Sequence, residues 1–276
     1  MPLLGLLSSC LWGTSDFLGG VLSRRLPVFV VVGTAQVFGL IVMAVMATAA
    51  GQWGLPLTYV PWSLLAAVCG ISGLIVFYMA LARGTMGIVA PIAACGVVVP
   101  VVVGLFTGSV PAPIQAVGIV IAIVGLIFAT GPELKGDGDT KSLVLAAAAG
   151  LLFGVTLTAI AAGSETSAIM TVTGMRIFSV AFFAVLALIK RSTGGVRRGD
   201  LPALFTIGLC DATANVTLGL AASGDNLTIA AVLGSLYPVI TVLLAWRFLH
   251  ERLRKIQYIG VAATILGVIT ITAAAA

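Results

Sequence analysis

The sequence predicts an all-α membrane protein of ten transmembrane helices, arranged as two inverted five-helix repeats. Of its 276 residues, 60% are hydrophobic and only 8% are charged, whereas a soluble domain carries about 25% charged residues. The apolar residues fall in ten runs, each close to the roughly 20 residues that a helix needs to span a bilayer. The two halves of the chain also repeat one another at an offset of about 140 residues.

Each apolar run is predicted to be a helix, because a segment in lipid must satisfy its backbone hydrogen bonds internally. Strands of a closed barrel would alternate in polarity over about ten residues, but stretches such as 97–103 and 116–127 are apolar all round. The expected helices cover residues 3–22, 27–50, 61–82, 86–106, 112–131, 141–162, 167–189, 201–221, 226–249 and 254–274.

The connections are short, and the longest polar ones are 131–141 and 190–200. The first lies in the middle of the chain, and its Gly and Asp content suits a flexible turn. We therefore expect a first five-helix repeat at 1–131, a linker at 132–140 and a second five-helix repeat at 141–276. No connection is large enough for a soluble catalytic domain, so an enzyme is not expected.

Matched motifs occur in the same order in both halves, which supports an internal duplication. Five spans are an odd number, so the second half must cross the membrane in the opposite sense from the first. Inverted repeats are typical of secondary transporters, whose substrate site lies near the midplane between the repeats. A duplicated scaffold that transports nothing is the alternative. The matched motifs are Trp12-Gly13 with Phe153-Gly154, Pro100 with Pro238, and Gln115, Gly118 and Gly125 with Gln257, Gly260 and Gly267.

Several other functions find no support in the sequence. The net charge of +5 comes from basic residues placed singly or in short groups between apolar runs, which is typical of membrane topology rather than nucleic-acid binding. No P-loop is present, so ATP-driven transport by this chain is not expected. The four cysteines lie in apolar runs without a C-x-x-C motif and are interpreted as small buried hydrophobes, so neither a metal nor another cofactor is expected. They are Cys10, Cys69, Cys95 and Cys210.

Ionisable residues inside the spans are the first candidates for a site, because each raises the free energy of insertion by about 2.5–3.5 kcal/mol. Asp211 lies at the centre of the eighth span, with Asn215 one turn further along the same face. Arg176 lies near the middle of the seventh span and Asp16 two-thirds along the first. One interpretation is a polar cavity in which Asp16 binds a proton or a cationic group. The other is that Arg176 and Asp211 form a structural salt bridge and Asp16 reaches the membrane interface.

Uncharged side chains complete the expected site. Trp12, Tyr78 and Tyr237 are expected to form aromatic walls of the site, and Gln36 is a lone amide in the second span. Packing or anchoring at the membrane interface is the alternative role for each. Prolines within spans remove a backbone hydrogen bond, so Pro91, Pro100 and Pro238 are expected hinges or static bends. The expected substrate-binding residues are therefore Asp211, Asn215, Arg176, Asp16, Trp12, Tyr78, Tyr237 and Gln36.

A set of short motifs runs in order along the whole chain. They are Trp12, Gly13 and Phe17, Ala80-Leu81-Ala82 with Gly84, Pro100 and Pro238, and His250-Glu251-Arg252-Leu253 followed by Gln257, Gly260 and Gly267. With these motifs the chain resembles the EamA branch of the drug/metabolite transporter superfamily. The resemblance implies a ten-helix carrier of small metabolites, amino acids or drugs, commonly an exporter. One departure is 107–111, where the family usually shows a Gly-Glu-Arg-Leu-like turn.

The distribution of charge predicts the orientation in the inner (plasma) membrane. Thirteen of the fourteen Lys and Arg residues lie in or beside the odd-numbered connections, while the even connections hold only Glu165 and Asp225. The positive-inside rule places the odd connections in the cytoplasm and both termini outside. The family resemblance implies termini inside, and we follow the charge distribution of this sequence.

The expected function is secondary transport of a small organic solute by alternating access, as an exporter. A proton-coupled antiporter of cationic drugs, with an essential carboxylate at Asp16 or Asp211, is one alternative, and a non-transporting membrane scaffold or sensor is another. The expected partners are a small-molecule substrate, the lipid bilayer and protons as a candidate coupling ion, in a monomer or a homodimer.

Overall fold

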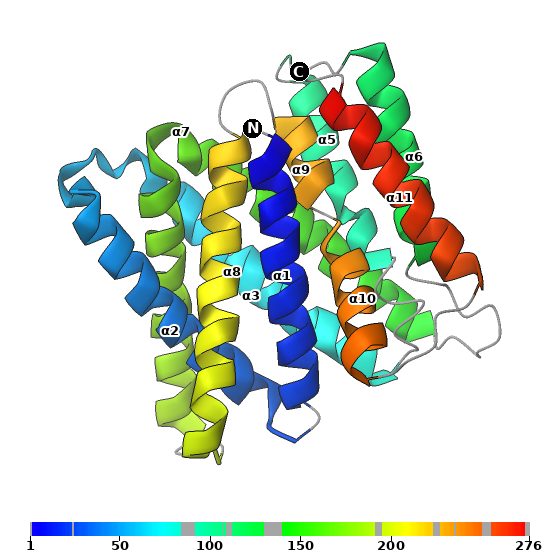
Figure 1. Cartoon of the computed structure of the whole chain (residues 1–276). Coiled ribbons are helices and arrows are strands. Elements are labelled where there is room, and N and C mark those ends of the chain that lie inside the picture. Colours follow the sequence, from blue (N-terminus) through cyan, green and yellow to red (C-terminus); the bar gives the residue numbers. More distant parts are fainter. Residues whose placement is uncertain are drawn as a thin grey trace.

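The computed structural model describes residues 2–23, 25–83, 92–106, 108, 112–129, 140–190, 195–222, 227–234, 236–249 and 255–273. These residues form helices joined by turns, and no β-strand occurs among them (Figure 1). The α-helices are α1 (Pro2–Ser23), α2 (Val28–Ala49), α3 (Val60–Arg83), α5 (Val98–Phe106), α6 (Pro113–Ala129), α7 (Thr140–Lys190), α8 (Leu201–Ala222), α9 (Leu227–Gly234), α10 (Tyr237–Leu249) and α11 (Lys255–Ala273).

Proline marks the beginning of several helices. Pro2, Pro61, Pro113 and Pro202 each lie in the first turn of a helix, where the backbone N–H would have no intrahelical partner and proline removes nothing. After α2, Gly51 adopts a φ of 63°, a left-handed conformation that glycine adopts without strain and that commonly ends a helix.

The predicted spans agree with α1, α2, α3, α6, α8 and α11 to within two residues at each end. The chain is therefore an all-α, multi-pass membrane protein. Within the described residues, four helical stretches are both long and apolar enough to cross a bilayer, so the predicted number of ten spans is supported only in part. These stretches are Val28–Ala49, Leu57–Phe77, Leu143–Ile189 and Arg198–Ala222.

The prediction of one uninterrupted helix over 226–249 is wrong. The helix α9 ends at Gly234 and α10 begins at Tyr237, with Leu236 in a turn between them. With a rise of 1.5 Å per residue, these helices are about 12 Å and 20 Å long, so neither crosses a hydrocarbon core of about 30 Å alone.

The predicted helix 86–106 is also interrupted. A 3₁₀ turn at Cys95–Val97 precedes α5, and Pro91 lies outside the described residues. The other two expected hinge prolines, Pro100 and Pro238, lie in the first turns of α5 and α10. Each proline therefore follows a break in the helix and does not bend a continuous one. A first turn tolerates proline, because the backbone N–H would have no intrahelical partner there.

The predicted helices 141–162 and 167–189 are joined without a loop. They form the two arms of α7, separated at Ser167, whose backbone is extended (φ −170°, ψ 121°). A straight helix of 51 residues would be about 77 Å long, far more than a bilayer's thickness. The chain instead folds back at Ser167, and a Cβ on Gly163 would lie 2.5 Å from the Thr171 side chain.

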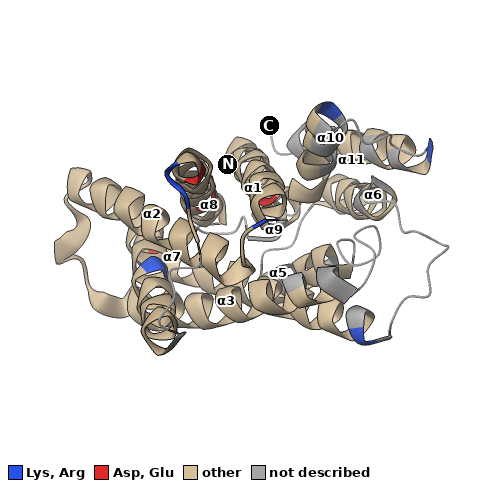
Figure 2. Ribbon diagram, turned by 90° about the horizontal axis from the view of Figure 1, so that it is seen from below, with Lys and Arg blue, Asp and Glu red and all other residues tan. Residues whose placement is uncertain are grey.

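The helices form two rows when the molecule is viewed along them (Figure 2). One row contains α2, α8, α1, α10 and α11, and the other contains α7 and α3. Small residues allow close contact between neighbours. On α3, Gly73 faces Phe153 in the first arm of α7, while Ser63 faces Gly174 in the second.

The helices α6 and α11 pack through a reciprocal pair of glycines. A Cβ on Gly125 would lie 2.4 Å from the backbone N of Thr264, and a Cβ on Gly267 would lie 2.5 Å from the backbone N of Ala122. The duplicated Gly125 and Gly267 therefore have the packing role expected for small residues between transmembrane helices.

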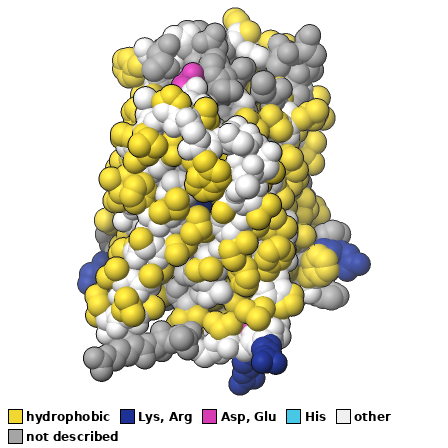
Figure 3. All heavy atoms as spheres, turned by 90° about the vertical axis from the view of Figure 1, so that its left-hand side faces the viewer, with side chains coloured by type: hydrophobic (Ala, Val, Ile, Leu, Met, Phe, Trp, Pro, Cys, Tyr) yellow, Lys and Arg dark blue, Asp and Glu magenta, His cyan; other side chains and the backbone are white. Residues whose placement is uncertain are grey.

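Large apolar side chains cover much of the surface in Figure 3, and Lys and Arg atoms lie toward its lower end. Leu3, Phe106 and Leu188, for example, are 79%, 87% and 77% exposed. Such a surface is typical of contact with lipid, because a soluble monomer rarely exposes large contiguous apolar patches. At one end, Arg25 lies 2.5 Å from Asp200 as an ion pair, which joins the connection after α1 to the connection before α8.

Candidate functional site

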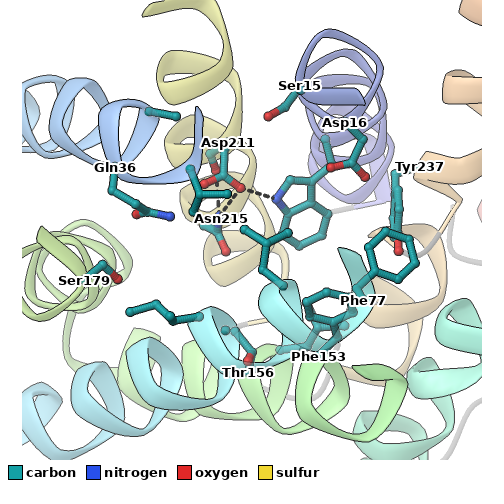
Figure 4. Close-up of a pocket in the computed structure, with 18 of the residues that line it drawn as sticks. Ser15, Asp16, Gln36, Phe77, Phe153, Thr156, Ser179, Asp211, Asn215 and Tyr237 are labelled. Carbon is teal, nitrogen blue, oxygen red and sulfur yellow. Dashed lines mark hydrogen bonds between the residues drawn. The ribbon is translucent and has the colours of Figure 1, made fainter. Parts of the chain in front are cut away.

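A cavity of about 160 Å³ lies within the bundle, between helices from both halves of the sequence. By volume it has room for on the order of ten water molecules. Its walls come from α1, α2 and α3, from the Ala93–Val97 region, and from both arms of α7, α8 and the start of α10. Figure 4 shows polar side chains from α1, α2, α7 and α8 around this space, with aromatic side chains on one side.

Asp211 is the centre of a hydrogen-bond network in the cavity wall. Its Oδ1 accepts a hydrogen bond from Trp12 Nε1 at 3.1 Å and a longer one from Asn215 Nδ2 at 3.3 Å. Asn215 also donates to the backbone carbonyl of Asp211 at 2.6 Å, as its position one helical turn later allows. The Asp211 side chain is 29% exposed, so it is held by protein groups while still facing the cavity.

Arg176 is the positive partner of Asp211. Its Nη2 lies 2.7 Å from Asp211 Oδ2, and its Nη1 donates a hydrogen bond to Gln36 Oε1. The Arg176 side chain is only 1% exposed, so it sits in a region where an unpaired charge would be strongly unfavourable. Among the described residues, its Nε has no hydrogen-bond partner, and neither has the buried Ser179 Oγ one turn further along α7.

Asp16 differs from Asp211 in having no ion pair or hydrogen bond with any residue that the structure describes. It lies on α1, one turn after Trp12 and on the same face of the helix. Both residues line the cavity. Because Arg176 is already paired with Asp211, the Asp16 carboxylate is the uncompensated charge among the described residues of the wall.

Two aromatic pairs border the polar groups. Trp12 and Tyr237 meet edge to face, with ring centroids 6.2 Å apart and planes at 73°. Phe77 and Phe153 form a second edge-to-face pair at 5.8 Å and 67°. Aromatic pairs prefer this geometry, and all four residues line the cavity, which therefore presents apolar surface beside its carboxylates.

The structure brings seven of the eight expected site residues to this one cavity. Tyr78 belongs to α3, but its side chain lies outside the described residues, and Pro100 and Pro238 are not in the cavity wall. The seven residues are Trp12, Asp16, Gln36, Arg176, Asp211, Asn215 and Tyr237.

The expected site did not include several polar and aromatic residues that also line the cavity, among them Phe77, Phe153, Thr156 and Ser179. The duplication offers a signal for Phe153, because it matches Trp12 at an offset of 141 residues. Ser179 lies three residues after Arg176 on the same face of α7. Thr156 has no comparable signal, since its hydroxyl donates to the Leu152 carbonyl one turn earlier, a bond that threonine forms in many helices.

Among the described residues, no group of three or more His, Cys, Asp and Glu side chains could hold a metal ion. Cys210 is buried and Cys69 partly buried, but Cys10 is exposed, so the interpretation of all four cysteines as buried is wrong for Cys10. A cysteine behaves as a small hydrophobe and is therefore compatible with a lipid-facing position on α1. The Cys95 side chain lies outside the described residues.

The comparisons with known proteins agree with this architecture. A family model described as the EamA-like transporter family matches residues 1–131 and 140–273. A solved crystal structure of another protein, 17% identical in sequence, superimposes with a TM-score of 0.79 over 98% of this chain and 96% of the other. At that identity the similarity shows a shared fold alone. No curated protein matches the sequence.

Proposed function

Because the chain belongs to the EamA-like transporter family, we propose that it is a secondary transporter that exports small organic solutes through the central cavity by alternating access. The family is one of transporters, so a role in moving solutes across the membrane follows from membership. Export, the transport mechanism and the residues that bind the solute are the parts proposed here.

The observation that carries the proposal is the composition of the cavity wall. Trp12, Asp16 and Gln36 come from the first half of the chain, and Arg176 and Asp211 from the second. A site between two repeats can open to either side when the repeats move relative to one another. Aromatic and apolar side chains beside a few polar groups are typical of sites for small organic molecules.

We further propose ten spans in two inverted repeats, with a first repeat at 1–131, a linker at 132–140 and a second repeat at 141–276. Equivalent contacts between the halves support this arrangement. A Cβ on Gly13 would lie 2.5 Å from Ile240 Cβ, and a Cβ on Gly154 would lie 2.6 Å from Val99 Cβ. Both glycine and both contacted positions are related by the same offset of 141 residues.

The direct test is solute flux. Comparing metabolites inside and outside cells that overexpress or lack the protein identifies candidate solutes and the direction of movement. Purified protein in proteoliposomes should then move the identified solute when it is radiolabelled. If folded protein moves none of the identified solutes, with or without a proton gradient, a non-transporting scaffold or sensor becomes the better interpretation.

A proton-coupled antiporter of cationic solutes is the second candidate function. The Asp16 carboxylate favours it, because this group has no partner among the residues that the structure describes. A carboxylate without a protein partner can bind a proton and a cationic solute in turn. Asp16→Asn is therefore expected to lower gradient-driven uptake of a cationic solute at least about tenfold, since a charge-assisted hydrogen bond contributes roughly 1.5–3 kcal/mol. Uptake into proteoliposomes with an imposed pH gradient measures the effect.

Glu165→Gln is the matched control for Asp16→Asn. It also neutralises one carboxylate, but Glu165 is exposed at the fold-back of α7, outside the cavity wall. Its uptake should stay within about twofold of the wild type. Equal uptake by Asp16→Asn and the wild type at every imposed gradient would exclude Asp16 as the coupling group.

The charge distribution also gives a testable orientation, with odd connections in the cytoplasm and both termini outside. A reporter that is active only in the cytoplasm should stay inactive when fused after Ala276 and become active when inserted after Gly195, in the connection before α8. Activity at Ala276 together with inactivity at Gly195 would reverse the orientation.

Cross-linking in the membrane distinguishes a monomer from a homodimer.

A further inference from the structure

The indole of Trp12 touches both the Asp211 carboxylate and the break between α9 and α10. Its Nε1 donates to Asp211 Oδ1 at 3.1 Å, and its ring meets Tyr237, the first residue of α10, edge to face. A Cβ on Gly234, the last residue of α9, would lie 3.6 Å from Trp12 Cζ3. One side chain thus joins the charged centre of the cavity to both ends of a helix break.

Side-chain hydrogen bonds join the break to α1. Ser9 Oγ donates hydrogen bonds to the carbonyls of Leu233 and Gly234 at the end of α9. The Leu233 carbonyl also accepts a backbone hydrogen bond from Leu236 across the break, at 3.3 Å. Thr241 Oγ1 bonds the Gly13 carbonyl at 3.2 Å. Because α1 supplies these contacts and Trp12 as well, a change at Trp12 acts on the segment where α10 can turn relative to α9.

From these contacts we propose that Trp12 is a positioning residue that couples occupation of Asp211 to movement at the α9–α10 break. A solute that donates to Asp211 Oδ1 takes the place of the indole N–H. The indole is then free to leave Tyr237, and α10 is released. This inference rests on the proposed transport, because occupation means that a transported solute binds to Asp211. The contacts of Trp12 with Asp211 and Tyr237 can be tested without a solute.

The chemistry of Asp211 indicates which solutes act in this way. Its Oδ2 faces the buried Arg176, so Oδ1 is the atom whose partners are uncharged, namely the Trp12 indole and the Asn215 amide. A cationic donor forms a stronger bond to a carboxylate than an uncharged donor does. Solutes with an ammonium group should therefore displace the indole, and solutes that carry only a carboxylate should not.

The first test measures hydrogen–deuterium exchange over residues 227–249 of the full chain in lipid nanodiscs. Trp12→Phe keeps an aromatic ring beside Tyr237 but removes the N–H, and exchange there should rise about tenfold, as expected for loss of a hydrogen bond to a charged group. Trp62→Phe is the matched control, since Trp62 is exposed on α3, away from the cavity, and should leave exchange unchanged. Unchanged exchange in Trp12→Phe overturns the proposal.

A double-mutant cycle with Asp211→Asn separates coupling from packing. Asp211→Asn raises exchange by itself, because it leaves the buried Arg176 without its charge partner. If the indole acts through Asp211, adding Trp12→Phe to Asp211→Asn raises exchange no further. If the two effects multiply, Trp12 acts by packing alone and the proposal is wrong. Should Trp12→Phe fail to fold, Tyr237→Leu breaks the other end of the same link. It should raise exchange to a similar extent, and no rise would equally overturn the proposal.

The second test uses two probes with one carbon skeleton, phenethylamine and 3-phenylpropionate. At saturating concentration, phenethylamine should raise exchange over residues 227–249 in the wild type, 3-phenylpropionate should not, and Trp12→Phe should respond to neither. A rise with both probes or with neither overturns the assignment of ammonium solutes. Absence of flux in proteoliposomes would count against the proposed transport only, because the exchange measurements need no net movement of solute.

Discussion

Asp211→Leu is expected to destabilise the protein by about 3–5 kcal/mol, because it leaves the buried Arg176 guanidinium without its charge partner. Arg176 is 1% exposed, and Gln36 would be its remaining hydrogen-bond partner among the described residues. An uncharged amide cannot compensate a full charge removed from water. Denaturation of the purified protein in detergent measures the loss of stability. The readout is the fraction of protein that remains folded and monodisperse.

The reciprocal variant Arg176→Leu should be milder, on the order of 1–3 kcal/mol. The carboxylate that it leaves behind is 29% exposed to the cavity and keeps its bonds from Trp12 and Asn215. The order of the two single variants is therefore a prediction of the geometry. A larger loss of stability in Arg176→Leu than in Asp211→Leu would contradict the assignment of Asp211 as the member of this pair that faces the cavity.

The double variant Arg176→Met with Asp211→Leu distinguishes a structural salt bridge from a transport site. Replacing a whole buried ion pair by apolar residues is often neutral or stabilising, so most of the lost stability should return. Transport should nevertheless stay at least about tenfold below the wild type if Asp211 contacts the solute. Full recovery of both stability and flux would show that the pair serves only to hold α7 and α8 together.

Gly154→Ala is the second substitution expected to have a large effect. A Cβ at this position would lie 2.3 Å from the Gly96 carbonyl oxygen and 2.6 Å from Val99 Cβ, so the backbone would have to move. Overpacking of this kind destabilises by about 1–3 kcal/mol, occasionally more, which corresponds to a Tm lower by roughly 2–12 °C. Thermal unfolding monitored by size-exclusion chromatography provides the measurement.

Two further glycines provide a second test of this prediction and its control. Gly13→Ala should have a comparable effect, because a Cβ there would lie 2.5 Å from Ile240 Cβ and 2.8 Å from the Tyr237 carbonyl. Gly20→Ala is the matched control in α1, since nothing lies within 4 Å of its Cβ position and alanine favours a helix over glycine. A loss in Gly20→Ala as large as in Gly154→Ala would show that helix flexibility, not close packing, explains both.

The positions of most helices followed from the apolar runs, but the breaks in the fourth and ninth runs did not. Residues 226–249 remain apolar across the break, and a hydropathy pattern does not distinguish one long helix from two short ones. Gly234 and Pro238 flank the break and are local signals for it. Their meaning depends on α1, whose Ser9 supplies hydrogen bonds to the carbonyls of Leu233 and Gly234 at the end of α9.

The candidate site was predictable to the extent that its residues are polar in an apolar context. Asp16, Arg176 and Asp211 stand out for that reason, and the structure places them around one cavity. Phe153 and Ser179 do not stand out, because aromatic residues and serines are common in membrane helices. They belong to the cavity only through the packing of α7 against α3 and α8.

The sequence by itself determined that this chain is helical, lies in the membrane and belongs with a family of transporters, because hydrophobicity and a repeated order of motifs are properties of the chain alone. Only the tertiary structure decided that Asp211 pairs with Arg176 while Asp16 has no partner among the described residues, and that Trp12 links Asp211 to the α9–α10 break. The physical reason is that these contacts join residues up to 225 positions apart, from Trp12 to Tyr237. Which residues so far apart meet depends on the relative positions of packed helices, and close packing at Gly13 and Gly154 determines those positions.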